Sequence, residues 1–223
     1  MNKRIISGLA ALAVVFSGAG SLPTEMFEGF SLTASAADGV ASGTCGENLT
    51  WELDSEGTLT ISGTGDMTNY GSVKSPWNKY NDDIKNVVIK DGITSIGNNA
   101  FSGCQNITDI NLPDGVKSIG SYAFSNCKSL ESINLPDSIN SIKLCAFNYC
   151  TNLTSIVIPD GVTSIGNRTF LDCKNLAEVT IPDSITSIDD YAFANCTNLT
   201  GINLPDGITN IGPGAFSKCQ SLA

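Results

Sequence analysis

Histidine is absent from the 223-residue chain, and its absence removes several kinds of function. Neither a Ser-His-Asp triad nor a Cys-His pair can form, and no imidazole can bind a metal ion or act as a pH switch. Charged residues are also few, at 15% of the chain, and 22 acidic residues outnumber 12 basic ones. The net charge of -10 argues against nucleic acid and anionic membrane surfaces, because both attract Lys and Arg. We therefore expect no catalytic residue, no metal ligand and no cofactor.

The chain also lacks an apolar run long enough to span a membrane. The apolar stretch at residues 5–16 is shorter than the about 20 residues that a transmembrane helix needs. It follows the basic pair Lys3 and Arg4, and the small residues at 34–36 are typical of a cleavage site. We predict that residues 1–37 are a signal peptide, with a buried N-terminal helix as the alternative. The mature protein should then be secreted or lie on the cell surface, without a transmembrane segment.

A repeat of 23 residues organises the rest of the chain. Phenylalanine, cysteine and aspartate each recur at this step, at Phe101, Phe124, Phe147, Phe170, Phe193 and Phe216, at Cys104, Cys127, Cys150, Cys173, Cys196 and Cys219, and at Asp91, Asp114, Asp137, Asp160, Asp183 and Asp206. A unit this short cannot bury its own apolar residues, so like residues must stack between neighbouring units. We predict a solenoid of six 23-residue units over residues 81–223, truncated at the C-terminus.

One unit, residues 152–174, indicates the local structure. Ile156 and Ile158 lie on one face with Val157 between them, which predicts a short strand with one buried face, and Pro159 ends it. Asp160 and the following glycine are typical of a turn. A second extended piece follows, and a tight helical turn around Phe170 and Cys173 closes the unit. The predicted fold class is a repeat solenoid that is mainly β, with a parallel sheet on one side and short helical turns.

The repeated pattern L-x-x-I-x-L-P-D-x-V-x-S-I-x-x-x-A-F-x-x-C closely resembles the BspA-like leucine-rich repeat. The resemblance covers residues 84–223, and residues 43–77 resemble the N-terminal portion of such proteins. It implies an exported bacterial protein, often surface-attached and associated with adhesion or protein binding, and it implies no catalytic residues. Lys90, the pair Leu144 and Cys145, and Thr169 depart from the pattern at single units. Each departure can be absorbed locally.

Residues 38–80 form a separate N-terminal piece. Two alternating segments, 49–53 and 58–62, flank a turn-forming sequence and predict a β-hairpin. A solenoid exposes its apolar columns at its ends, so we predict that this hairpin region is a cap, in which Trp51 or Trp77 covers the first unit. A small ligand-binding domain is the alternative.

Two residue columns invite chemical interpretations. The six repeated cysteines stack at about 4.8 Å, too far apart for disulfides and too linear for tetrahedral zinc. We therefore expect buried free thiols, and we do not expect Cys45 and Cys145, which lie outside the column, to form a disulfide. The six repeated aspartates form no cleft, so turn formation explains them better than a glycosidase pair. They could still collect Ca²⁺ weakly.

Outward-facing positions of the strand sheet form the predicted binding face. Its residues are Asn86, Val88, Asp109, Asn111, Ser132, Asn134, Ser155, Val157, Glu178, Thr180 and Asn203. These rows contain no Trp, Tyr or Arg, which are the residue types enriched at binding hot spots. A solvated face of a spacer is therefore an alternative of similar weight. Tyr122, Arg168 and Tyr191 share one position on the turn side and could form a second patch.

These features predict a non-catalytic module for protein binding or adhesion. Its partner would be a protein or polysaccharide surface. The alternative is a structural stalk that displays a domain beyond residue 223, such as an anchor, a dockerin or an enzyme.

Overall fold

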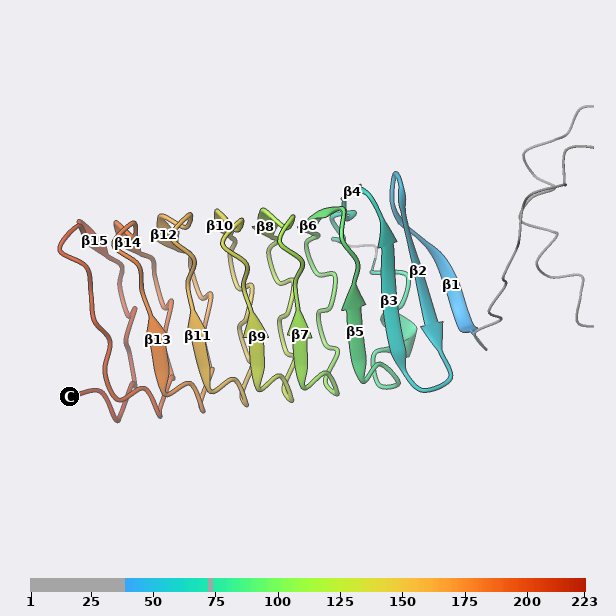
Figure 1. Ribbon diagram of the computed structural model, residues 1–223. Coiled ribbons are helices and arrows are strands. Elements are labelled where there is room, and N and C mark those ends of the chain that lie inside the picture. The colour runs from blue at the N-terminus through green and yellow to red at the C-terminus, as the bar shows by residue number, and fades with distance from the viewer. Residues whose placement is uncertain (1–38, 72–73) are drawn as a thin grey trace, which may run out of the picture. The chain divides into compact units, whose positions relative to one another are not determined.

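Short parallel strands lie one beside another in two rows along the described chain, which comprises residues 39–71 and 74–223 of this computed structural model (Figure 1). The first row contains β5 (Asn86–Ile89), β7 (Asp109–Asn111), β9 (Ser132–Asn134), β11 (Ser155–Val157) and β13 (Glu178–Thr180). The second row contains β4 (Gly65–Asp66), β6 (Ile93–Ile96), β8 (Ser118–Ile119), β10 (Ser141–Ile142), β12 (Ser164–Ile165), β14 (Ser187–Ile188) and β15 (Asn210–Ile211). The predicted signal peptide, residues 1–37, lies outside the described residues.

The register between coils is constant at one repeat length. In the first row Ile110 pairs with Ile133 and Ile156 pairs with Val179, while in the second row Ile165 pairs with Ile188. The first-row strands from β7 to β13 each show an exposed-buried-exposed pattern. Equivalent residues therefore stack, and the predicted solenoid with parallel strands is confirmed.

Phenylalanines form the central column of the core. From Phe101 to Phe216, the ring centroids of neighbouring coils are 5.2–5.5 Å apart and the ring planes lie within 11° of parallel. Trp77 continues this column toward the N-terminus, with its ring 5.7 Å from that of Phe101. Each ring stacks on the rings of the neighbouring coils, so the column ties each coil to its neighbours.

The column cysteines have a specific polar partner as well as an apolar site. Cys150 Sγ donates a hydrogen bond to the carbonyl oxygen of Phe124 at 3.1 Å, and the same oxygen accepts the N–H of Cys127 at 3.2 Å. Equivalent thiol bonds of 3.1–3.2 Å recur from Cys127 to Cys219. All eight thiols are free, and all but Cys219 are buried. A small side chain with one weak donor suits this position.

The predicted helical turn around Phe170 and Cys173 is wrong, because this segment is a series of tight turns. Arg168 and Asp172 have left-handed backbone conformations, with φ of 53° and 60°. Every second N–H group donates to the next coil. The N–H of Phe170 bonds the Ala192 carbonyl at 2.8 Å, whereas that of Cys173 bonds the carbonyl of Phe170, in its own coil, at 3.2 Å. A helix would keep all these bonds within one coil, so its backbone could not bond to the next coil as this segment does.

We call this side of the solenoid the turn edge. It comprises residues 97–104 and their counterparts in the later coils, 120–127, 143–150, 166–173, 189–196 and 212–219.

The N-terminal piece joins the same sheet. It contains three antiparallel strands, β1 (Gly39–Gly46), β2 (Leu49–Asp54) and β3 (Thr58–Gly63). β3 then pairs in parallel with β5, so the strand row continues without a break. The one helix among the described residues is the 3-10 turn η2 (Asn78–Tyr80). The hairpin strands are thus present, while the capping role and the boundary at residue 80 stay predictions.

Candidate functional site

The predicted binding face is a row of side chains on the first-row strands, which pair from β5 to β9 and from β11 to β13, and Asn203 follows them outside any strand. Ten of its residues are exposed and Val88 is half-buried; the exposed ones are Asn86, Asp109, Asn111, Ser132, Asn134, Ser155, Val157, Glu178, Thr180 and Asn203. Pairing between β7 and β9 places Asn111 beside Asn134, whose Nδ2 donates to Asn111 Oδ1 at 3.3 Å. Val157 is an apolar residue that is 63% exposed, because it faces outward in its strand. These residues share one surface, and their role in binding stays a prediction.

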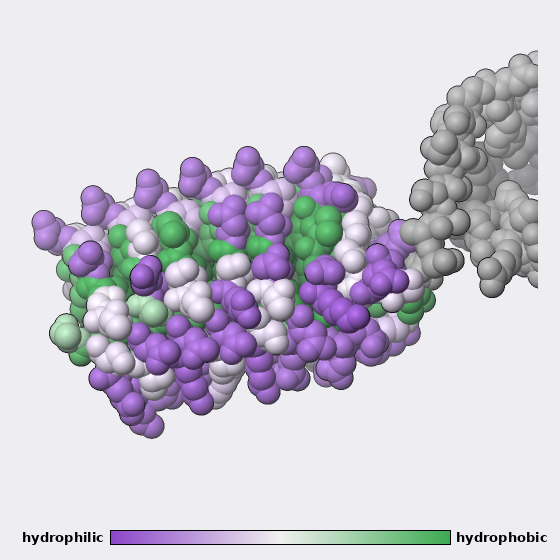
Figure 2. All heavy atoms as spheres, turned by 60° about the horizontal axis from the view of Figure 1, so that its bottom comes forward, coloured by the Kyte–Doolittle hydropathy of each residue, from purple (hydrophilic) through white to green (hydrophobic). Residues whose placement is uncertain are grey.

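Aromatic residues are exposed on the turn edge. Tyr122, Tyr149 and Tyr191 are 37–45% exposed, and the guanidinium of Arg168 lies 5.3 Å from the ring centre of Tyr191. Tyr122 and Tyr191, like Arg168, occupy one left-handed position of the repeat. The turn edge therefore carries the Tyr and Arg side chains that the strand face lacks. Figure 2 shows another part of the surface, where polar residues recur along the stack with apolar residues between them.

The repeated aspartates lie in exposed turns after the first-row strands. Within residues 39–71 and 74–223, no cluster of three or more Cys, Asp or Glu side chains could hold a metal ion. The turn interpretation of these residues agrees with their position.

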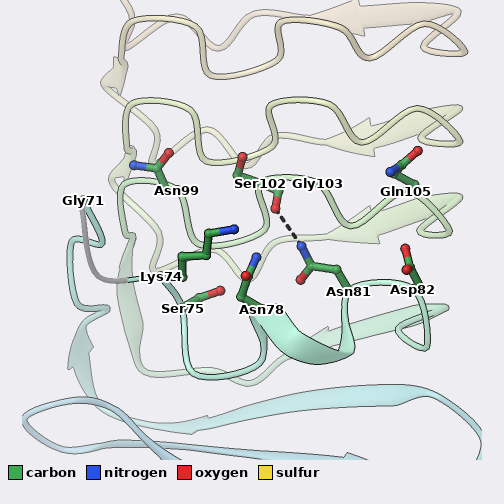
Figure 3. Close-up of a pocket in the computed structure, with 10 residues that line it drawn as sticks. All are labelled: Gly71, Lys74, Ser75, Asn78, Asn81, Asp82, Asn99, Ser102, Gly103 and Gln105. Carbon is green, nitrogen blue, oxygen red and sulfur yellow. Dashed lines mark hydrogen bonds between the residues drawn. The ribbon is translucent and has the colours of Figure 1, made fainter.

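A hollow of about 450 Å³ lies where the N-terminal piece meets the first repeat (Figure 3). No pattern in the repeats predicts it. Its lining residues are Gly71, Lys74, Ser75, Asn78, Asn81, Asp82, Asn99, Ser102, Gly103 and Gln105.

Side-chain hydrogen bonds explain why the hollow forms. Between later coils, turn-edge carbonyls accept backbone N–H groups, as Ala123 accepts from Phe101 at 2.8 Å. In the first repeat, the equivalent carbonyl of Ala100 accepts the indole Nε1–H of Trp77 at 2.8 Å. The next equivalent, that of Ser102, accepts Nδ2–H of Asn81 at 2.9 Å. Because these donors are side chains, the main chain that carries them lies farther from the first repeat than a main chain that donates its own N–H groups.

Extra residues make this separation possible. Asn99 bonds the carbonyl of Tyr70 across 29 positions of sequence, whereas Trp77 bonds Ala100 across 23. The segment from Tyr70 to Trp77 is therefore six residues longer than the segment between their partners, Asn99 and Ala100. The sequence signal for the site was this longer coil, together with Asn81 at the position where later units have cysteine.

Residues 79–200 and 142–223 match the BspA type leucine-rich repeat region, in six copies. The chain belongs to this family. As a BspA-type leucine-rich-repeat protein it is similar to a leucine-rich cell surface protein of Faecalibacterium prausnitzii, with 33% identity and a TM-score of 0.62, over 84% of this chain and 55% of that one. It is also similar to a leucine-rich repeat protein of Bacteroides ovatus, with 29% identity and a TM-score of 0.64, over 79% of this chain and 51% of that one.

A third similar structure is the leucine-rich repeat protein of T. pallidum, with 27% identity and a TM-score of 0.52, over 78% of this chain and 87% of that one. The BspA-type chain thus spans about half the length of the first two structures. No curated protein matches it. Over residues 39–71 and 74–223, no helix has both the length and the apolar character to cross a membrane.

Proposed function

We propose that this BspA-type chain is a non-catalytic binding module that works outside the cell, at a bacterial surface, and contacts a protein through its strand face. The observation that carries the proposal is the row of exposed side chains that recurs every 23 residues from β5 to β13, with paired strands from β5 to β9 and from β11 to β13. Small amides and hydroxyls such as Asn111 and Ser132 can each donate or accept, so an extended partner surface can be matched coil by coil. The surface location is supported by the name of the similar cell surface protein.

Affinity should come from the length of the contact. The face has no Trp, Tyr or Arg, so it offers few of the anchors that dominate compact interfaces. Many weak contacts, or several copies of the module, would then supply the binding energy. The same lack of anchors supports the alternative function, a stalk that displays another domain.

Binding to intact bacterial cells tests the proposal. Fluorescent protein is added to cells that are untreated, protease-treated or periodate-treated, and bound protein is measured by flow cytometry. The variant Asn111→Arg/Asn134→Arg alters the strand face, and Tyr122→Ala/Tyr191→Ala is the matched change on the turn edge. We expect binding that protease treatment and the strand-face variant both abolish, with the turn-edge variant unaffected.

Other outcomes assign the function elsewhere. Loss of binding after periodate treatment alone would identify a polysaccharide partner. Loss only in the turn-edge variant would move the site to that edge. No binding by a folded protein would favour the stalk.

A further inference from the structure

The hollow at the first repeat has the chemistry of a site for a small neutral polar ligand. Among the described residues that line it, no side chain is aliphatic or aromatic, and six of the ten carry a neutral amide or hydroxyl. Lys74 is the one cation and Asp82 the one carboxylate among these described residues, so the two charges cancel. An apolar ligand would find no apolar wall there, and an anion would meet Asp82 and a chain of net charge -10. One carboxylate is too few to hold a divalent cation.

Part of the lining is fixed by hydrogen bonds. Asn81 donates to the carbonyl of Ser102 at 2.9 Å and accepts from Cys104 Sγ at 3.4 Å, so both ends of its amide are used. Asn99 donates to the carbonyl of Tyr70 at 2.8 Å, and Asn106 donates to that of Asp82 at 2.7 Å. These bonds hold the two coils at their separation, so the walls are in place before a ligand enters.

Other lining groups are left to a ligand. Among residues 39–71 and 74–223, no hydrogen bond engages the side chains of Lys74, Asn78, Asp82 or Gln105. In Figure 3, Lys74 and Asn78 reach toward Ser102 on one side, and Asp82 and Gln105 lie on the other. They present amide donors, amide acceptors, one ammonium and one carboxylate around one space.

We propose that this hollow binds one sugar residue that carries an acetamido group. Each sugar hydroxyl both donates and accepts, as do the amides of Asn78 and Gln105, and an acetamido group is the natural complement of a side-chain amide. The volume is within the range of about 300–1,000 Å³ seen for small-molecule sites. This function is separate from the protein contact proposed for the strand face. No aromatic ring is among the described residues that line the hollow, so the dissociation constant should lie at about 1 mM.

Titration of isotope-labelled protein with N-acetylglucosamine, followed by NMR chemical shifts, tests the site. We expect saturable shifts confined to residues 74–82 and 98–106. Asn78→Ala/Gln105→Ala should weaken the apparent affinity at least about tenfold, which corresponds to about 1.4 kcal/mol. The matched control, Asn111→Ala on the strand face, should leave it unchanged. The NMR spectrum of each free variant shows whether the fold is intact.

Three results would overturn the assignment. Shifts that do not saturate by about 50 mM, far above the expected dissociation constant, would mean that no site exists. Saturable shifts located on the strand face, or unchanged in the double variant, would place the site elsewhere. Saturable shifts with glycylglycine but not with the sugar would identify a zwitterionic ligand held between Lys74 and Asp82.

Discussion

Left-handed residues recur twice in every coil of the turn edge. At the first of the two positions φ is 53–58° in Asn99, Tyr122, Cys145, Arg168 and Tyr191. An L-residue in this conformation costs about 1–2 kcal/mol. Bonds between coils offset this cost, because each such residue directs its N–H to the next coil, as Arg168 does to the Asp190 carbonyl at 3.0 Å. The conformation of these residues is therefore a property of the stack.

The buried thiols of the cysteine column should make stability sensitive to alkaline pH. Burial raises the pKa of Cys104 to about 12, and it holds the pKa of Cys127 and Cys150 well above the ordinary value. Above about pH 8.5 the unfolded chain loses thiol protons that the folded chain keeps. The free energy of unfolding should then fall as pH rises through this range and beyond, up to the folded-state pKa.

Urea unfolding in the presence of reductant, between about pH 8 and 10, measures this slope. Cys150→Ala should make it shallower by about 1 kcal/mol per pH unit, which is the effect of one proton. Cys219→Ala is the control, because Cys219 is only half-buried and should change the slope less. Equal slopes in the wild type and both variants would contradict the expectation.

The N-terminal coil meets the first repeat through side chains, and this element has its own test. Trp77→Phe keeps an aromatic ring on Phe101 but removes the donor to the Ala100 carbonyl. We expect the free energy of unfolding to fall by about 1–3 kcal/mol, the range for an orphaned buried polar group. Trp51→Phe is a matched control, because the Nε1–H of Trp51 is buried without a partner among the described residues.

The two tryptophan variants are compared by chemical denaturation. If Trp51→Phe lowered the free energy of unfolding as much as Trp77→Phe does, ring volume, and not the indole hydrogen bond, would join this coil to the repeats.

The strands and the residue columns could be predicted from the sequence, whereas the hydrogen bonds between coils could not. The alternation around Ile156 and the proline after it were sufficient for the strand, and the 23-residue step was sufficient for the columns. The helical turn was predicted wrongly because the carbonyl that accepts the Phe170 N–H lies in the next coil. The hollow was missed for a similar reason, since the side chains of Trp77 and Asn81 replace backbone donors.

Across the whole molecule, stability should depend on where a residue lies in the stack. Phe147 is fully buried between Phe124 and Phe170, with ring centroids 5.4 and 5.5 Å away. Phe216 is half-buried and, among the described residues, stacks only on Phe193. In a protein made of these 223 residues, Phe147→Ala should therefore cost about 3–5 kcal/mol, and Phe216→Ala clearly less.

Hydrogen exchange distinguishes local from global effects of these two changes. Phe216→Ala should raise exchange only in the last coil, because each coil contacts only its neighbours. Phe147→Ala should raise it on both sides of the altered coil. An equal loss of stability from both variants would argue against nearest-neighbour coupling.

The carbonyls on the N-terminal side of the first repeat set the direction in which such a chain can grow by duplication. Those of Asn98, Ala100 and Ser102 are already engaged by the Tyr70 backbone and by the side chains of Trp77 and Asn81. A unit copied in front of the first repeat would have to replace it as the acceptor of the Trp77 and Asn81 side-chain donors. A unit copied between two later coils would meet, on both sides, the donors and acceptors of its own original. Changes in coil number should therefore arise inside the stack, while the first coil remains a fixed point of origin.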